Sequence, residues 1–256
     1  MIDTHCHLDK AEFDADRTAV LERARAAGVS DLVVPAVGPP WDDLLALARA
    51  TPGVHAGLGV HPQLLPELDP CDDDQLLSDL ESALGRGGAV AVGECGLDGP
   101  SAEGAPLDRQ RWVLAGHLAM ARRFSLPVSL HCLRAHEPLL DLLEREPLPA
   151  GGVLHSYSGG PELVARYARL GLCFAFAGPV TFEKARRPLE AVRAVPADRL
   201  LLETDAPDQT PRPRRGRNEP AFLPEIAAAV ARALGTTVEA VDAFTSANAR
   251  RLFRLG

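Results

Sequence analysis

The stretch GVLHSYSGGPELVARYARL, residues 152–170, contains one complete strand–helix unit. The run 152–154 has no polar side chain, which is typical of a strand buried on both faces within a parallel sheet. Glycine and polar residues follow, and Pro161 then stands where a helix is expected to begin, because proline is favoured at the first helical position. Segment 161–170 is therefore predicted to be a helix that packs back against its own strand.

The same alternation recurs along the whole chain. We interpret eight apolar runs as buried parallel strands: 1–4, 32–37, 56–60, 89–92, 127–130, 152–154, 172–175 and 200–202. Helical patterns lie between and after them, at 15–27, 107–124, 161–170, 220–234 and 238–253. Eight such units in 256 residues favour a single-domain α/β fold, a TIM (β/α)8 barrel over residues 1–256. A doubly wound open sheet of eight strands is the alternative.

Composition and charge narrow the class of protein. Hydrophobic residues make up 46% and charged residues 24% of the chain, as in ordinary globular proteins. We find no run of about 18 apolar residues and no secretory pattern in residues 1–10, so we expect no membrane segment and no signal peptide. The 5 scattered cysteines, without a CxxC pair, favour a reducing, cytoplasmic location. Because the net charge is −8, a polyanionic substrate would need metal ions or a local arginine cluster.

Reactive side chains gather where the predicted strands end. His5 and His7 follow the first strand, and other candidates follow later strands: His61 the third, Glu94 the fourth, His131 the fifth, His155 the sixth and Asp205 the eighth. In a barrel, the carboxyl ends of the strands form the face on which active sites are built. Each histidine alone could equally be a hydrogen-bonded core residue, but the whole set at one end of the barrel indicates a functional site.

This donor set suits two divalent ions. His5 and His7 lie two apart on a strand, so their rings point the same way and could hold one ion together with Asp205. His131 and His155 would hold the other ion, and Glu94 would bridge the pair. Imidazole-rich sites favour zinc or manganese over calcium. Two such ions activate a shared water, from which Asp205 could accept a proton. The neighbouring Cys6, Cys95 and Cys132 are expected to be buried apolar groups rather than ligands.

Several motifs together resemble one known family. IDTHCHLD (2–9), GVHP (59–62), VGECGLD (92–98), LHC (130–132), LHSYSGG (154–160) and LLETDAP (201–207) are similar to the TatD family of metal-dependent hydrolases, in the family's order and spacing. VPAV (34–37) and the segment 109–128 are most similar to its YjjV-like branch.

The resemblance implies a barrel of the metallo-dependent hydrolase type, with two divalent ions (zinc, manganese or magnesium) and deoxyribonuclease activity. It implies the same six ligands, and it places His61 in the pocket, against the scissile phosphate or the attacking water.

The chain departs from the family pattern around the expected substrate. Leu133 stands where an arginine is common, and Arg134 beside it could take over that role. Gly99 replaces an aromatic residue after GLD, and Asp208 replaces a tyrosine after TDAP. The loop PRPRRGRNEP (211–220) carries Arg212, Arg214, Arg215 and Arg217 after the last strand, where barrels often bind phosphate. We expect Arg134, Arg215 and Arg217 to bind substrate. A solvated loop without such a role is the alternative.

Two classes of hydrolase remain open. The first is a phosphodiesterase acting on DNA or nucleotides, with His61 and an arginine holding the phosphate, and with action at strand ends or on short substrates. The second is a hydrolase of a small amide, ester or lactone, which the changes at Leu133, Gly99 and Asp208 favour. A barrel that has lost its activity is a third possibility, which the complete ligand set argues against. Neither Lys10 nor Lys184 lies where a carbamylated lysine bridge would be needed. We expect the protein to act as a monomer.

Overall fold

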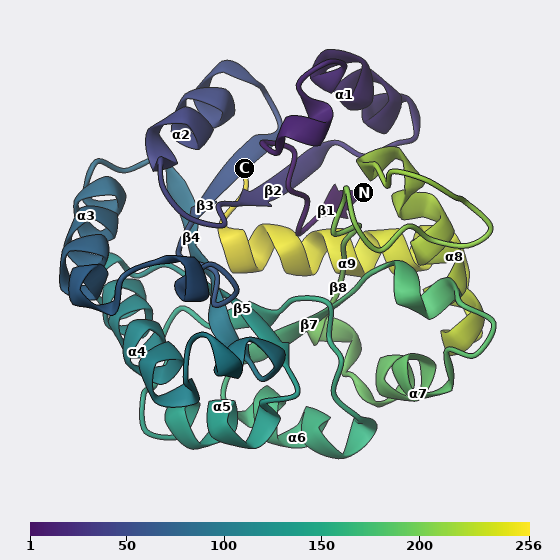
Figure 1. The fold of residues 1–256 in the computed structure, drawn as a ribbon. Coiled ribbons are helices and arrows are strands. Elements are labelled where there is room, and N and C mark those ends of the chain that lie inside the picture. The colour runs from purple at the N-terminus through teal and green to yellow at the C-terminus, as the bar shows by residue number, and fades with distance from the viewer.

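The computed structural model describes all 256 residues, and its eight strands form one parallel sheet in chain order (Figure 1). The strands are β1 (Ile2–Asp3), β2 (Asp31–Pro35), β3 (Val54–Leu58), β4 (Ala89–Asp98), β5 (Val128–Leu133), β6 (Gly152–Leu154), β7 (Leu172–Phe176) and β8 (Leu200–Leu202). The sheet curls so that β8 meets β1, where the Thr4 backbone N–H donates to the Leu202 carbonyl at 3.0 Å. The predicted barrel is thereby confirmed, and the open sheet is excluded.

Helices surround the barrel. They are α1 (Arg17–Ala26), α2 (Trp41–Ala50), α3 (Asp73–Gly85), α4 (Leu107–Phe124), α5 (His136–Leu143), α6 (Pro161–Arg169), α7 (Arg186–Ala194), α8 (Leu223–Leu234) and α9 (Val238–Phe253). Residues that favour helix ends stand where two of these helices begin or end. Pro161 begins α6, and α8 ends at Gly235, whose φ of 67° suits a residue without a side chain. The predicted helix 220–234 is divided into the short 3-10 turn Pro220–Phe222 and α8.

The core has two parts. The larger cluster of 58 buried residues lies mostly between the strands and the helices. A smaller cluster of 10 residues includes small inward-facing strand residues such as Ala91, Val153 and Ala175, together with Phe253 of α9. Helix α9 crosses the end of the barrel at which the strands begin (Figure 1), and Asn248 on it donates to the Leu200 carbonyl at 2.9 Å. The amino end of the barrel is therefore closed by α9, which leaves the carboxyl end for a site.

No single helix is both long and apolar enough to cross a membrane. The consecutive segments Pro220–Leu234 and Val238–Phe253 meet that length and composition only together, as a pair bent by 106°.

A candidate metal centre at the carboxyl end of the barrel

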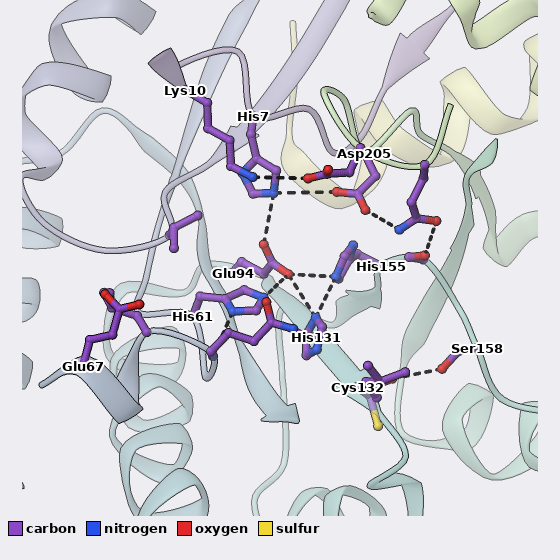
Figure 2. A pocket seen from close by; sticks show the side chains of 17 residues that line it. His7, Lys10, His61, Glu67, Glu94, His131, Cys132, His155, Ser158 and Asp205 are labelled. Carbon is purple, nitrogen blue, oxygen red and sulfur yellow. Dashed lines mark hydrogen bonds and ion pairs between the residues drawn. The ribbon is translucent and has the colours of Figure 1, made fainter. Parts of the chain in front are cut away.

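A pocket of about 530 Å³ opens at the carboxyl ends of the strands (Figure 2). Of the seven residues predicted at strand ends, six line it, namely His7, His61, Glu94, His131, His155 and Asp205, and His5 is fully buried behind them. Side chains separated by up to 200 positions in the sequence thus meet in one place, because all the strands are parallel and end at the same face.

One group of donor atoms is centred on Glu94 Oε2. His5 Nε2 lies 3.2 Å from this oxygen, and His7 Nε2 lies 3.4 Å from it. The same two nitrogens are 3.3 Å apart, and they lie 3.7 and 3.6 Å from Asp205 Oδ1. Ligand atoms around a tetrahedral ion with bonds of about 2.0–2.2 Å are separated by about 3.3–3.6 Å. The four atoms therefore have the spacing of a metal coordination shell.

A second group is centred on the other oxygen of the same carboxylate. Glu94 Oε1 lies 2.8 Å from His155 Nε2, 3.2 Å from His131 Nδ1 and 2.8 Å from His61 Nε2. His131 Nδ1 and His155 Nε2 are 3.2 Å apart. One carboxylate thus turns each of its oxygens toward a different cluster of imidazoles, which is the arrangement that a ligand bridging two ions requires.

Glu94 lies within the fourth strand, although the sequence predicted that this strand ends at residue 92 and that Glu94 follows it. Strand β4 continues from Ala89 to Asp98, and its pairing with β5 is irregular between Val92 and Cys95. Beside this irregularity the chain lies close to Gly59, where a Cβ would come 2.5 Å from the Gly93 Cα. Because glycine at position 59 allows this close approach, Glu94 can turn into the barrel mouth.

Buried partners fix the orientation of the histidine rings. His7 Nδ1 lies 3.1 Å from the Pro35 carbonyl, and His131 Nε2 lies 2.9 Å from Asp98 Oδ2. If each of these nitrogens carries the ring proton, the opposite nitrogen keeps its lone pair toward the pocket. His155 Nδ1 faces Glu203 Oε1 at 3.7 Å. The partners of His7 and His131 thus favour the tautomers that a metal ligand needs, whereas His155 Nδ1 has no partner at hydrogen-bond distance.

Burial and charge act in opposite directions on the ionisable groups. Burial lowers the pKa of His5 to about 4 and that of His7 well below its usual range, so both rings are neutral at pH 7. Burial alone would raise the pKa of Glu94, but His61, His155 and His5 outweigh it and hold that carboxyl ionised. Burial raises the pKa of Asp205 to about 7. Burial would lower the pKa of His155, but Glu94 and Glu203 outweigh it and raise that pKa well above its usual range. The positive charge that balances Glu94 is thus a ring proton, which a divalent cation would replace on binding.

Three further acids, which are not among the predicted ligands, support this arrangement. Asp98 faces His131, and Glu203 faces His155. Asp3 accepts from the backbone N–H groups of His5 and Thr204, at 3.2 and 2.9 Å, and so ties the two loops that carry His5 and Asp205 together. All three are fully buried. They belong to the motifs IDTHCHLD, VGECGLD and LLETDAP. Their position beside a buried apolar run is the sequence feature that could have identified them.

The arginines expected to bind substrate lie outside the pocket. Arg134 and Arg215 are exposed and do not line it. Arg217 pairs with Asp16 at 2.8 Å and lies over the ring of Phe13, 4.7 Å from its centroid. The nearest cation in the pocket wall is Lys10, whose Nζ is 3.4 Å from Asp208 Oδ2. Leu133 lines the pocket and Gly99 does not. Substrate binding by the three arginines stays a prediction.

The cysteines lie as expected. Cys6, Cys95 and Cys132 are buried within the larger hydrophobic cluster, and none belongs to a group of potential ligand atoms. Of the remaining histidines, His117 is fully buried and accepts a hydrogen bond from the Val60 backbone N–H at 3.0 Å.

Comparisons with known proteins agree with this geometry. The family model described as TatD related DNase matches residues 2–254. The chain is 35% identical over 260 residues to a Bacillus subtilis protein named uncharacterized metal-dependent hydrolase YabD, covering 100% of this chain and 99% of that one. It is 37% identical over 262 residues to the Cronobacter sakazakii protein named 3'-5' ssDNA/RNA exonuclease TatD, covering 99% and 97%. The crystal structure of YjjV, a TatD homolog from Escherichia coli, superposes with a TM-score of 0.92 at 35% identity, covering 100% and 98%.

Proposed function

The chain belongs to the TatD-related family of metal-dependent hydrolases, and we propose that it hydrolyses phosphodiester bonds at the end of a single nucleic-acid strand with the help of two divalent ions. One observation carries this proposal. The two oxygens of Glu94 face two separate clusters of buried donor atoms, which a structural carboxylate would not need.

The ligands divide between the two ions. His5, His7 and Asp205 would hold one, His131 and His155 would hold the other, and Glu94 would face both. His61 Nε2 lies within hydrogen-bond distance of Glu94 and lines the pocket, so it can orient a phosphate oxygen or the attacking water. Nitrogen donors outnumber oxygen donors, which favours zinc over magnesium.

The residues of the pocket then have distinct tasks. Bound divalent ions would lower the pKa of a water molecule and polarise an oxygen of the phosphate, whose phosphorus atom the water attacks. Asp205 accepts the proton of that water, and its second oxygen is oriented by the Gln209 amide. Lys10, on the pocket wall, offers a positive charge to the phosphate when its contact with Asp208 opens.

The size and charge of the site favour a strand end as substrate. A cavity of about 530 Å³ is in the range that encloses a small ligand, so it suits a terminal nucleotide better than the side of a duplex. Lys10 is also the one lysine or arginine that lines this cavity, so the cavity itself offers few contacts to the phosphates of a duplex. The name 3'-5' ssDNA/RNA exonuclease, carried by relatives 36–38% identical to this chain, points the same way.

Substitution of the bridging carboxylate tests the proposal. Glu94→Gln removes the charge and keeps the shape, so we expect loss of bound metal and of nearly all hydrolysis of a 12-nucleotide oligothymidylate. Glu67→Gln is the matched control, because Glu67 lines the same pocket but belongs to neither cluster. Metal content by mass spectrometry of the purified variants is the second measurement. Full activity of a Glu94→Gln variant at saturating metal would overturn the assignment.

A second candidate is hydrolysis of a small amide, ester or lactone by the same centre. It is favoured by the scarcity of positive charge in the pocket, where Lys10 is the one lysine or arginine and already faces Asp208. A panel of p-nitrophenyl phosphodiesters, amides and lactones separates the two. Turnover of carbonyl substrates far above that of diesters would replace the first proposal with the second.

A further inference from the structure

Phe182 is unusually exposed for an aromatic residue in this chain. Only two large hydrophobic side chains are exposed, Trp112 at 47% and Phe182 at 40%. Phe182 directly follows the 3-10 turn Gly178–Thr181 that comes after β7, and the Arg212 guanidinium lies 5.7 Å from the centroid of its ring. An aromatic ring that remains open to solvent, with a cation beside it, is a feature typical of surfaces that stack nucleic-acid bases.

The surroundings of Phe182 are strongly basic, although the protein is acidic. Segment 182–188 carries one acid and three cations, and segment 211–217 carries four arginines and no acid. Three of these seven cations are paired with acids: Arg187 with Glu162, Arg214 with Glu225 and Arg217 with Asp16. The other four have no carboxylate within ion-pair distance and are exposed, namely Lys184, Arg186, Arg212 and Arg215. Positive charge that the fold does not use is therefore gathered beside the exposed ring.

The two segments are held together. The Arg212 backbone N–H donates to Thr181 Oγ1 at 2.7 Å. A Cβ on Gly178 would lie only 1.7 Å from the Gln209 carbonyl oxygen, so glycine there lets the two loops touch. Phe182 and Arg212 thus lie side by side, and Lys184, Arg186 and Arg215 are exposed residues within four positions of one or the other. We call these five residues the basic platform.

The basic platform adjoins the metal pocket. Gln209, three residues before Arg212, lines that pocket. Ser156 and Ser158 line it too, and they also line a smaller cavity of about 240 Å³, together with Pro179, Val180 and Arg187. A chain that leaves the pocket over these serines therefore arrives at the segment that carries Phe182.

We propose that the basic platform binds the part of a single-stranded nucleic acid that extends beyond the nucleotides in the metal pocket. One base stacks on Phe182, and the phosphates on either side lie against the four unpaired cations. This inference rests on the proposed phosphodiesterase function and adds a second contact region to it. Stacking and charge recognise any base, so the platform increases affinity for longer strands without selecting a sequence.

The length of the substrate tests the proposal. A thymidine dinucleotide fits within the metal pocket, whereas a 12-nucleotide oligothymidylate reaches the platform. For Phe182→Ala we expect KM to rise about tenfold for the 12-mer, the usual effect of losing one stacked base, and to stay unchanged for the dinucleotide. Trp112→Ala is the matched control, because it removes the other exposed aromatic side chain, which lies on α4. Equal KM values for the 12-mer in Phe182→Ala and wild type would overturn the inference.

Salt dependence tests the cations independently of catalysis. Fluorescence anisotropy of a labelled 12-mer bound to Glu94→Gln protein gives the dissociation constant without hydrolysis. Adding Arg215→Ala should reduce the slope of log K against log salt by about 0.7, the value for one phosphate contact on a single strand. Arg232→Ala is the matched control, because Arg232 is an exposed arginine in the last turn of α8. An unchanged slope in Arg215→Ala would show that Arg215 does not contact the strand and is not part of the basic platform.

The two proposals fail in different ways. If metal-loaded wild type hydrolyses no phosphodiester, the proposed function fails, and the anisotropy measurement still decides whether the platform binds a strand. If wild type hydrolyses both substrates but Phe182→Ala hydrolyses the 12-mer as well as wild type does, the platform fails and the proposed function stands.

Discussion

Substitution of Asp98 should weaken one metal site and spare the other. Asp98 Oδ1 accepts from the Ser101 backbone N–H at 2.8 Å. Its Oδ2 lies 3.0 Å from the Gln63 amide nitrogen and 2.9 Å from His131 Nε2. Burial would raise the pKa of this carboxyl, but these hydrogen bonds outweigh it and hold the pKa well below its usual range. The ionised form with two accepting oxygens is therefore the form that orients His131.

Asp98→Asn keeps the shape and removes one acceptor. An amide has one accepting oxygen and one donating nitrogen, so at least one of the three donors will face an N–H group whichever way the amide turns. His131 Nε2 then faces either an N–H group or a neutral oxygen that accepts more weakly than a carboxylate, so its ring is held less firmly in both cases. Loss of such a supporting carboxylate costs 10–100-fold in metal affinity, or about 1.4–2.7 kcal/mol. We expect that loss only for the ion held by His131 and His155.

Calorimetric titration of metal-free protein with zinc or manganese measures both sites. The ion at His5, His7 and Asp205 should bind within about twofold of wild type, since none of these side chains contacts Asp98. Asp208→Asn is the matched control, because it makes the same change in an acid of the same pocket that pairs with Lys10. Wild-type affinity at both sites in Asp98→Asn, or an equal loss at both, would refute the reasoning.

Three further outcomes are expected. Chelation of metal should lower the melting temperature by several degrees in scanning fluorimetry, because an ion at 100 times its Kd stabilises the fold by about 2.7 kcal/mol. A melting temperature that does not depend on added metal would contradict a bound ion. Burial lowers the pKa of His117 to about 4, so the folded state resists protonation while the unfolded state accepts a proton near pH 6.5. The contribution of His117 to the free energy of unfolding is complete above pH 6.5 and falls by about 3 kcal/mol as the pH drops toward 4. In urea titrations, the free energy of unfolding of His117→Gln should therefore fall less than that of wild type over this interval. Arg217→Ala should lower the melting temperature slightly and leave KM unchanged, because the Arg217 guanidinium pairs with Asp16 and packs over the ring of Phe13. A raised KM without loss of stability would show that Arg217 binds substrate.

The strand pattern could be predicted because buried parallel strands are apolar on both faces. Runs 152–154 and 200–202 coincide with β6 and β8, and the pairing of all eight strands in chain order follows from the repeated unit. Once the strands are parallel, their carboxyl ends must meet, so the meeting of His5, Glu94 and Asp205 could be predicted without knowing any distance.

The extent of β4 could not be predicted in the same way. Its last residues include Glu94 and Asp98, and charged residues mark the end of an apolar run in the sequence. Both are fully or almost fully buried, since His131, His155 and Gln63 satisfy their oxygens. A pattern of apolar residues cannot show that a carboxylate will find such partners, because they come from other strands and loops.

Which of the loop arginines remain free for a ligand could not be predicted from the sequence, for a related reason. The stretch PRPRRGR indicates a phosphate-binding loop when it is considered alone. In the fold, Asp16 and Glu225 lie close enough to neutralise Arg217 and Arg214, and Asp16 is 201 positions away from its partner. Only the charges that remain after these pairings, among them Arg212 and Arg215, are available to a ligand.

The net charge of −8 is consequently a poor measure of what a nucleic acid would meet at the carboxyl face. Several acids that contribute to it are buried around the metal pocket, where histidines and bound cations would balance them. Segments 182–188 and 211–217 together contribute an excess of positive charge at the surface beside that pocket. For a strand bound there by four free cations, the slope of log K against log salt would be no steeper than about −2.8. That slope is much shallower than the slope of a duplex-binding protein. Modest salt dependence combined with a length-dependent KM is therefore the behaviour that this distribution of charge requires.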